Sequence, residues 1–540
     1  YNYDSKGNLH ATLDPEGRIV KTRYDEEGNM RAIIYPDGSE TEFTYDEKGN
    51  IEEVKDGEGY VTKYRYDTLN RVSEITRANG NKISYEYTNS GKITTVKFGD
   101  NSRKEIIYNE RGFVSRETDE AGNSVNYKYN RAGNLSERID ENGDITKYEY
   151  DAMWNICKII KPDGSEIKYS YNKSNLLQMT EDEEGYCEYM LYDSNGNLTD
   201  YADRNEKVST REYDALNRIV KSTTPTGAET EFEYRYDGKL KKVTDALKGT
   251  EEFEYNRAGE LTEVKQNGTK VKEYRYNLKG YIESEKDSEG NEKRYEYSKN
   301  DNLTAVIYPD GSREEMSYDG NSNLILHRDR AGGETKYEYD KRDRLIKITD
   351  PMGSRKEIEY SLTGKVKSVT DELQRKTEYI YDKTGKLTGV IDAEGGKKEY
   401  KYNKTGKLIE IHSWNSDADR SNPIINKYLY DRRGMLTEEI NPLNNVKSYK
   451  YDGNGNLVTM TDEDGITAKY EYDAVNNLIK TEYNGELNTE YSYDILNRVT
   501  KIEKDNDQTR YEYDKRGRLS KVRELNDKVT EYRWSNNGQK

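Results

Sequence analysis

The chain has 540 residues, of which 32% are hydrophobic and 35% are charged, and its net charge is −17. This composition argues against ordinary globular domains, in which roughly 45–50% of residues are apolar, and the acidity argues against non-specific DNA or RNA binding, which needs a basic surface. Charge and hydropathy alone would indicate disorder. The 51 tyrosines argue against it, and a single-layer curved sheet whose aromatic rings supply the buried area fits better.

The ends of the chain carry no recognisable targeting signal. No stretch approaches the ~20 apolar residues that a transmembrane helix needs, and no signal peptide is visible. Because Tyr1 and Tyr3 already lie in the repeat described below, we expect the chain to be part of a longer secreted or cell-surface protein. Cys157 and Cys187 make no disulfide framework and are predicted to be unpaired small residues.

Tyrosines recur along the chain at steps of 21 residues. The first series is Tyr3, Tyr24, Tyr45, Tyr66, Tyr87, Tyr108, Tyr129, Tyr150, Tyr171, Tyr192 and Tyr213. After a predicted shift at Tyr236 and Tyr255, the step runs from Tyr276 through Tyr297, Tyr318, Tyr339, Tyr360 and Tyr381 to Tyr402. After an insertion it resumes at Tyr430, Tyr451, Tyr472, Tyr493 and Tyr513, with Trp534 in the last slot. These 26 anchors predict one array over residues 1–540, with an insertion loop at 411–423.

Each repeat contains two turn signals about ten residues apart. In the unit that starts at Tyr129, Asn130 to Gly133 forms the first signal and Asp140 to Gly143 the second. Asx residues begin turns by hydrogen bonding to the backbone ahead, and glycine tolerates positive φ.

Runs of about seven residues rich in Tyr, Ile, Val and Thr separate the turns, which is strand composition. Paired tyrosines such as Tyr148 and Tyr150 are two residues apart and point to the same face. Each unit is therefore predicted to be a β-hairpin, and the chain an all-β antiparallel meander of about 52 strands. A sheet roughly 250 Å wide does not stay flat, so we expect a curled spiral, a tube or a hollow shell.

The recurring motif resembles that of the YD-repeat, or RHS-repeat, family. Good copies of Tyr-Asp-x-x-Gly-Asn-Leu lie at Tyr192 to Leu198 and at Tyr451 to Leu457. The family includes bacterial Rhs toxins, the B and C components of insecticidal toxin complexes, wall-associated toxins and teneurins. The resemblance implies a hollow β-shell, which in the bacterial toxins encloses a C-terminal toxin and is closed by a core segment that often acts as an aspartyl autoprotease.

The chain departs from that pattern in its closing segment. The nearest copies of the family's DPxGL-type motif begin at Asp14 and Asp350. Both aspartates lie eleven residues past their anchor tyrosine, as Asp56 and Asp140 do, so we interpret them as ordinary turn starts. Without a distinct C-terminal toxin domain, neither autoproteolysis nor toxicity can be assigned.

No pattern predicts catalysis, a metal site or a cofactor. His10, His327 and His412 are far apart in sequence, and HExxH, P-loop, GxGxxG and CxxC patterns are absent. Trp154 and Trp534 are predicted to be aromatic packing residues. The chain is therefore predicted to be no enzyme, with hydrolase activity held as a remote alternative.

The step from Tyr402 to Tyr430 is 28 residues, seven more than the period. Insertions in repeat proteins become loops, often on a binding face. His412, Trp414, Asp417 and Asp419 could bind a sugar or a protein there, or Trp414 could simply fold onto the sheet.

Two functions remain open at this point. In the first, the array is a shell that encloses a polypeptide cargo, such as a C-terminal toxin, of a secreted or surface-delivered bacterial protein. In the second, it is a cell-surface structural, adhesive or glycan-binding repeat module without cargo.

Overall fold

The protein consists of β-strands and turns throughout its described residues. A computed structural model describes residues 1–414, 422–504, 507–524 and 528–535. Within them lie 51 strands and no helix, so no helix in this part of the chain is long and apolar enough to span a membrane.

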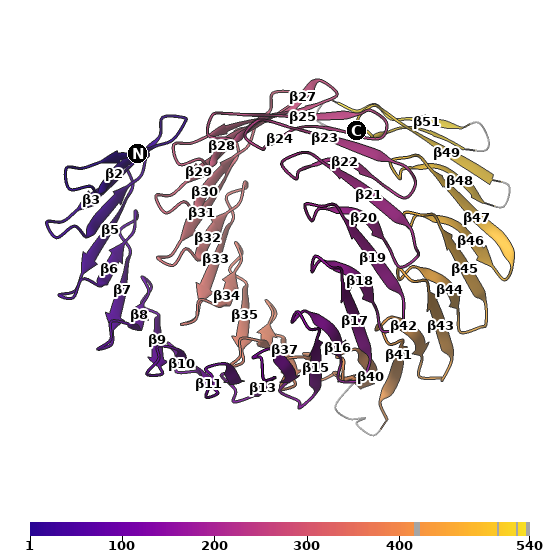
Figure 1. Cartoon of the computed structure of the whole chain (residues 1–540), viewed down its shortest axis with the longest axis horizontal. Coiled ribbons are helices and arrows are strands. Elements are labelled where there is room, and N and C mark those ends of the chain that lie inside the picture. The colour runs from indigo at the N-terminus through magenta and orange to yellow at the C-terminus, as the bar shows by residue number, and fades with distance from the viewer. Residues whose placement is uncertain (415–421, 505–506, 525–527, 536–540) are drawn as a thin grey trace.

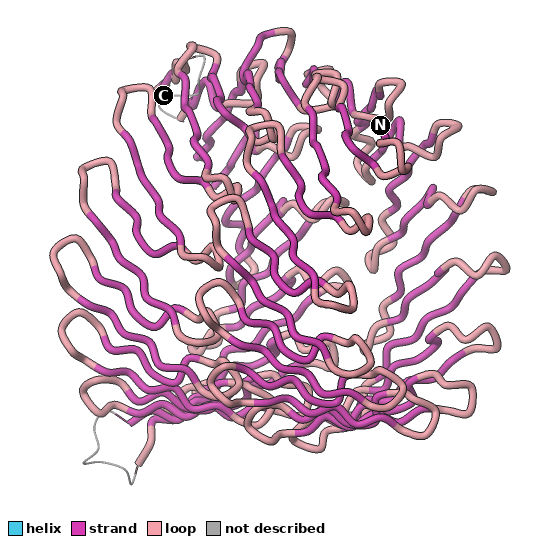
Figure 2. Tube along the Cα trace, turned by 90° about the vertical axis from the view of Figure 1, so that its left-hand side faces the viewer, coloured by secondary structure: helices cyan, strands magenta, loops and turns pink. Residues whose placement is uncertain are grey.

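The strands pair only with their neighbours in the chain, and every pair is antiparallel. The chain is therefore one continuous meander from β1 (Asn2–Tyr3) to β51 (Val529–Glu531). Figure 1 shows how this band winds. It descends through β2–β9, runs along the bottom through β10–β16, rises to β22 and crosses the top near β25. It then descends again through β28–β35 and rises a second time to β51. The sheet is thus a hollow spiral shell that stays open, because β1 and β51 are free edges, and Figure 2 shows the hairpin loops along both margins of the band.

We call β1–β24 the first winding and β25–β51 the second. The first winding comprises β1 Asn2–Tyr3, β2 Leu9–Leu13, β3 Ile19–Tyr24, β4 Met30–Ile34, β5 Glu40–Tyr45, β6 Ile51–Lys55, β7 Val61–Tyr66, β8 Val72–Thr76, β9 Lys82–Tyr87, β10 Ile93–Phe98, β11 Arg103–Tyr108, β12 Val114–Thr118, β13 Ser124–Tyr129, β14 Leu135–Ile139, β15 Ile145–Tyr150, β16 Ile156–Ile160, β17 Glu166–Tyr171, β18 Leu177–Glu181, β19 Cys187–Tyr192, β20 Leu198–Ala202, β21 Val208–Tyr213, β22 Ile219–Thr223, β23 Glu229–Tyr234 and β24 Leu240–Thr244.

The second winding comprises β25 Thr250–Tyr255, β26 Leu261–Gln266, β27 Thr269–Tyr276, β28 Ile282–Asp287, β29 Glu292–Tyr297, β30 Leu303–Ile307, β31 Arg313–Tyr318, β32 Leu324–Arg328, β33 Glu334–Tyr339, β34 Leu345–Thr349, β35 Arg355–Tyr360, β36 Val366–Thr370, β37 Lys376–Tyr381, β38 Leu387–Ile391, β39 Lys397–Tyr402, β40 Leu408–Trp414, β41 Ile424–Tyr430, β42 Leu436–Ile440, β43 Val446–Tyr451, β44 Leu457–Thr461, β45 Thr467–Tyr472, β46 Leu478–Tyr483, β47 Glu486–Tyr493, β48 Val499–Lys504, β49 Asp507–Tyr513, β50 Leu519–Arg523 and β51 Val529–Glu531.

Two turns of the same construction close each repeat. The A turn follows the anchor tyrosine, and the B turn begins eleven residues after it. In the B turn that starts at Asp14, the Asp14 Oδ1 atom accepts the backbone N–H groups of Glu16 and Arg18, each at 2.9 Å. Gly17, the fourth residue, has a φ of 84°, which glycine adopts without steric cost. Because A turns line one margin of the band and B turns the other, we call these margins the A rim and the B rim.

Most strands have five or six residues, fewer than the seven expected from the sequence. The turns account for the difference, because each turn also includes the residue that follows its glycine. In the turn at Asp14, for example, the backbone N–H of Asp14 donates to the carbonyl of Arg18 at 3.0 Å. Each A hairpin also contains a β-bulge. Lys128 pairs with Glu137 and Tyr129 with Leu135, which leaves Ser136 unpaired.

The anchor tyrosines connect neighbouring hairpins at the A rim. The ladder between β14 and β15 runs only from Glu137 opposite Lys147 to Ile139 opposite Ile145, and it stops short of the A rim. The hydroxyl of Tyr150 bridges that gap by donating to the carbonyl of Leu135 at 2.8 Å. Most of the predicted anchors donate the equivalent bond, among them Tyr24, Tyr45, Tyr66, Tyr129, Tyr150, Tyr276, Tyr339 and Tyr472. Tyr3 lies in the edge strand β1 and is 59% exposed, Tyr451 pairs with Leu457 across an A hairpin, and Trp534 donates its Nε1–H to Leu519 at 2.7 Å.

The shift predicted at Tyr236 is wrong. Tyr234 ends β23, and its hydroxyl donates to the carbonyl of Ile219 at 2.8 Å, as an anchor does. Tyr236 lies in the A turn that follows and is 95% exposed. The 21-residue step therefore runs unbroken from Tyr3 through Tyr234 to Tyr402.

Replacement of Tyr276 tests the anchor role. Tyr276→Ala removes both ring and hydroxyl and is expected to cost ~3–5 kcal/mol, while Tyr276→Phe removes only the bond to Leu261 and is expected to cost about 1 kcal/mol. Because repeat arrays unfold locally, the measurement is native-state hydrogen exchange in β26–β28. Tyr236→Ala is the matched control, and an equal loss in both alanine variants would contradict the anchor role.

Candidate functional site

The two windings meet tip to tip, where B turns of the first winding face A turns of the second. We call this line of contact the seam. Glu16, in the B turn of the Tyr3 repeat, accepts the backbone N–H of Arg257, in the A turn after Tyr255, at 2.7 Å. Tyr3 and Tyr255 are 252 residues apart, which is twelve periods. Most contacts below keep this offset of twelve repeats, and Arg342 reaches both the B turn at this offset, through Ser102, and the B turn of the next repeat, through Glu120.

The third residue of each turn makes many of the seam contacts. Glu58, third in its B turn, accepts the N–H of Lys299 at 2.8 Å. In the opposite direction, Asn300, third in its A turn, donates its amide N–H to Asp56 at 2.7 Å. The two tips therefore bind each other reciprocally, each through its third residue.

A second pair of tips repeats this reciprocal arrangement. Asn205 of a B turn donates to Asp452 at 2.8 Å, and Asn454 of the facing A turn donates to Asp203 at 2.8 Å. Gly453 lies so close to this B turn that an added Cβ atom would come within 2.6 Å of the Arg204 carbonyl oxygen. Only glycine therefore fits there without movement of the backbone.

A largely buried ion pair across the seam joins Arg342 to Glu120. Their Nη2 and Oε1 atoms are 2.6 Å apart, and the side chains are 15% and 3% exposed. The Arg342 guanidinium also lies 4.1 Å from the centre of the Phe98 ring. Burial opposes ionisation of nearby Asp100, but hydrogen bonds from Ser102 and the charges of Arg342 and Arg344 outweigh it and lower the Asp100 pKa.

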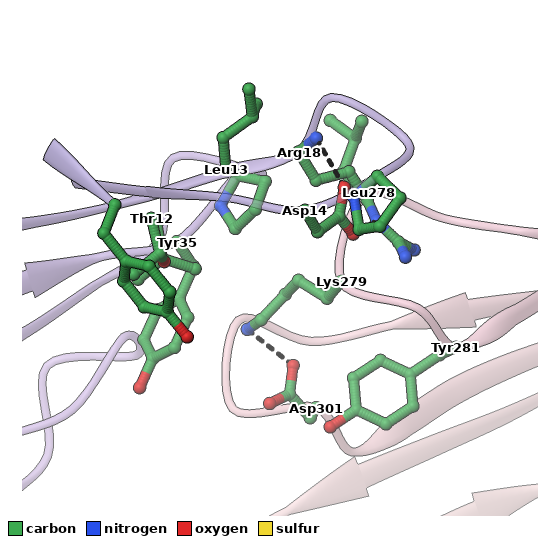
Figure 3. A pocket seen from close by; sticks show the side chains of 13 residues that line it. Thr12, Leu13, Asp14, Arg18, Tyr35, Leu278, Lys279, Tyr281 and Asp301 are labelled. Atoms are coloured by element: carbon green, nitrogen blue, oxygen red, sulfur yellow. Dashed lines mark hydrogen bonds and ion pairs between the residues drawn. The ribbon is translucent and has the colours of Figure 1, made fainter. Parts of the chain in front are cut away.

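A cavity of about 600 Å³ opens in the seam near the N-terminus. Figure 3 shows its walls, with Leu13 and Tyr35 from the first winding and Leu278 and Tyr281 from the second. The Lys279 Nζ atom lies 2.5 Å from Asp301 Oδ1, and its side chain is only 8% exposed. Arg18 is paired with Asp14 at 2.6 Å and with Glu260 at 2.9 Å. Since these cations already have carboxylate partners, a charged ligand would have to compete with the seam.

The described side chains of the seam are carboxylates, amides, ammonium and guanidinium groups that bind one another. Its charged side chains form ion pairs between the windings, and its asparagine amides donate hydrogen bonds to aspartates of the other winding. In the described ranges, no cluster of three His, Cys, Asp or Glu side chains could hold a metal ion.

The predicted binding loop is partly strand. His412 and Trp414 belong to β40, which extends to Trp414, so the expectation that residues 411–414 form a loop is wrong. The additional residues lengthen the ladder with β39, where Glu399 faces His412 and Lys397 faces Trp414. Asp417 and Asp419 lie outside the described residues.

His412 and Trp414 share one face with Glu410. The Glu410 carboxylate accepts Lys401 at 2.9 Å and contacts the His412 Nε2 atom at 2.7 Å. These two contacts lower the Glu410 pKa to about 2. The ring centres of His412 and Trp414 are 6.0 Å apart, and Lys397 Nζ lies 5.5 Å from the Trp414 ring. A ligand-binding role for this face stays a prediction.

Several other residues singled out in the sequence are turn residues. Asp350 accepts the N–H groups of Met352 and Ser354 at 2.9 and 2.8 Å, which is the ordinary turn start also seen at Asp14. Trp154 is no packing residue: it occupies the fourth position of an A turn with a φ of 66° and is 58% exposed.

Comparison with known proteins agrees with this geometry. The profile of the teneurin YD-shell family matches residues 1–116, 153–280 and 326–484, about three-quarters of the chain. The chain belongs to the teneurin YD-shell family. An RHS-repeat profile also matches the YD-shell at residues 108–145 and 129–166, and no curated protein matches it significantly.

Solved structures share the fold of this YD-shell. The crystal structure of TcdB2–TccC3 aligns with 98% of the chain at a TM-score of 0.57 and 13% identity, and the crystal structure of TcdB2–TccC3–Cdc42 aligns with 98% at 0.56 and 12% identity. The pore form of the Photorhabdus luminescens Tc holotoxin aligns with 97% at 0.50 and 13% identity. The chain covers 35%, 37% and 34% of those chains, about a third of their length.

Sequence reasoning missed the seam of this YD-shell entirely. Arg342, Glu120, Asn205 and Asn454 sit in turns that resemble all the others. The one signal available was the polar residue at the third turn position, as at Glu58, Asn205 and Arg342, but it does not say which tips meet.

Arg342→Ala is expected to loosen the seam, because it leaves the Glu120 carboxylate buried without its closest partner. Breaking a buried pair costs about 3 kcal/mol or more. Hydrogen exchange should accelerate in the turns at 119–122 and 340–343. Lys48→Ala, on the uncovered A rim of the first winding, is the control, and equal exchange in the two variants would contradict the seam.

Acid is expected to weaken the seam as well. The pKa of Asp100 and that of Asp343 are both lowered from 3.8 in the folded chain, so their stabilisation is complete above that value and is lost as the pH falls through the lowered one. Small-angle scattering between pH 7 and pH 2.5 should show the radius of gyration growing below about pH 3.8 before the strand signal in circular dichroism is lost. Simultaneous loss of both signals would contradict a separately labile seam.

Proposed function

We propose that the chain is a non-catalytic shell segment that encloses a polypeptide cargo, such as a C-terminal toxin, of a secreted or surface-delivered bacterial protein. The single observation that carries the proposal is the seam. A band that only needed to display a surface could curl loosely, whereas this band closes on itself through reciprocal contacts such as Asn205 with Asp452 and Asn454 with Asp203. A continuous wall is what isolates a polypeptide from proteases.

The dimensions suit an extended cargo. The tip between β2 and β3 meets the tip between β25 and β26, 23 strands later. At ~4.8 Å per strand the wall measures about 110 Å around and about 35 Å across between backbones, and strand tilt widens it. A folded domain of ~100 residues has a radius of gyration of about 13 Å. Once inward side chains are counted, such a domain barely fits, which favours a cargo without a compact fold.

The similar structures support the proposal through the proteins that they contain. Both crystal structures contain TcdB2 together with TccC3, and one of them also contains Cdc42. At 12–13% identity they support the wall architecture, and the cargo itself remains part of the proposal.

Protease protection tests the cargo function. A polypeptide of ~100 residues without stable fold, carrying one protease site, is fused after Lys540. We expect cleavage at least tenfold slower than in the same polypeptide free in solution. Arg342→Ala should accelerate it, and Lys48→Ala should not. Equal cleavage of fused and free cargo would remove the proposal.

An adhesive or glycan-binding module is the second candidate, favoured by the face of His412, Trp414 and Lys397. Trp414→Ala is expected to abolish binding to a glycan array if that face is a sugar site. Tyr236→Ala, which removes an exposed aromatic ring elsewhere on the sheet, is the control. Unchanged binding in the Trp414 variant would exclude the site.

A further inference from the structure

Four B turns share a construction that offers two oxygen acceptors to one cation. The third residue of each is an aspartate, and its Oδ1 atom accepts the hydroxyl of a serine two residues later. The carboxylate and the serine oxygen therefore lie side by side at the tip. The four pairs are Asp37 with Ser39, Asp100 with Ser102, Asp163 with Ser165 and Asp310 with Ser312.

Three of these pairs bind a cation that the chain itself supplies. Lys279 donates to Ser39 at 3.2 Å, and its Nζ atom lies 3.6 Å from Asp37. At the second pair, Arg342 donates to the serine at 3.3 Å and lies 3.8 Å from the aspartate. At the fourth, Arg330 donates its Nε–H to the serine at 2.7 Å and pairs with the aspartate. The construction therefore accepts both an ammonium and a guanidinium group.

The third pair lies in the seam opposite a turn that brings no cation to it. The preceding B turn donates from Asn142 to Asp382, in the A turn twelve repeats later. The following B turn accepts the N–H of Arg432 at the same offset. The A turn 403–406 therefore falls opposite the third pair. Its third residue is Thr405, where the two occupied seam sites have their lysine or arginine.

No other side chain of the facing turn replaces the missing cation. The hydroxyl of Thr405 donates within its own turn. Lys407, the fifth residue, extends toward Gly434, where an added Cβ atom would lie 2.9 Å from its Nζ atom. Within the described residues, Asp163 has a hydrogen bond only with Ser165 and no ion pair, and its side chain is exposed.

A cavity of about 500 Å³ opens beside the third pair, a volume typical of small-molecule sites, which span roughly 300–1,000 Å³. The third pair lines it together with five further carboxylates and only two cations, Lys168 and Arg432. Lys168 is already paired with Glu181 at 2.7 Å. Lys161 stands where the other three sites have an aromatic ring below the cation, and it is paired with Glu183. The cavity therefore has both space and negative charge for a further cation.

We propose that Asp163 and Ser165 bind an external organic cation, a guanidinium or primary ammonium group on an alkyl stem, in the way that the equivalent pairs of the seam bind Lys279 and Arg342. The carboxylates select the charge. The two oxygen acceptors select a cation with N–H donors, because hydrogen bonds between ionised partners are the short and strong ones. This site is separate from any enclosed cargo.

Calorimetric titration of the full chain with n-butylguanidinium tests the site. Tetramethylammonium, which has the charge but no N–H donor, is the matched ligand. Asp163→Asn removes the carboxylate, and Thr405→Lys supplies a cation from the facing turn. Lys279→Thr removes the internal cation from the first pair and so creates an equivalent site. Asp310→Asn is the control variant, because it changes the same kind of turn outside the seam, where Arg330 already occupies the pair.

We expect the wild type and D310N to bind one equivalent of n-butylguanidinium, D163N and T405K to bind at least tenfold more weakly, and K279T to bind a second equivalent, all with unchanged circular dichroism. No binding by the wild type, undiminished binding in D163N or T405K, or equal weakening in D310N would overturn the proposal. Equally tight binding of tetramethylammonium would also overturn it, as would a K279T variant that gains no second equivalent.

A blocked pentapeptide of glycines with a central arginine distinguishes two sources of the cation. Tighter binding of the peptide than of n-butylguanidinium assigns the site to an arginine side chain of a polypeptide, and the reverse order assigns it to a free small cation. Either order supports the site. Protease protection of a fused cargo does not depend on these titrations, so the two proposals can fail separately.

Discussion

The fold depends on one hydrogen bond repeated along the A rim. Each A hairpin carries a bulge, and the ladder to the next hairpin stops before the rim is reached. Without a further link, neighbouring hairpins would separate at that margin. The anchor hydroxyl supplies the link, and burial of the ring raises the pKa of Tyr150, so the phenol keeps its proton and remains a donor over the physiological range. A chain with only 32% hydrophobic residues can form a sheet of this size because each repeat brings its own aromatic ring and its own bond.

The seam is a different kind of interaction and gives the shell a different kind of stability. Within a winding, backbone ladders and tyrosine rings hold neighbours together. Between windings, the described contacts are made by turn tips through carboxylates, amides and guanidinium groups, and many of these side chains remain partly exposed. Ion pairs of that kind are screened by salt. The wall is therefore held more firmly along the chain, by strand ladders, than across the seam, by turn tips.

Much of the fold could be predicted from the sequence, because the signals are local. The tyrosine period, the Asx residue that starts each turn and the glycine that ends it act within one repeat. Tyr236 misled the prediction because Tyr236-Asp237 reproduces the family dipeptide, while the true anchor, Tyr234, precedes an arginine. The unbroken spacing from Tyr213 to Tyr255 would have identified it. The seam could not be predicted, since which tips meet is set by the accumulated curvature of some two dozen strands, and Glu120 lies 222 residues from Arg342.

The offset of twelve repeats restricts how such a protein can change in length. Although the step from Tyr402 to Tyr430 is seven residues longer than the period, the A turn after Tyr430 still lies opposite the B turn of the Tyr171 repeat. Loss of one whole repeat from the first winding would leave every hairpin intact. However, each later turn would then face a different turn across the seam. A deletion of a single repeat would therefore change the pairing along the whole seam while leaving the strand ladders unchanged.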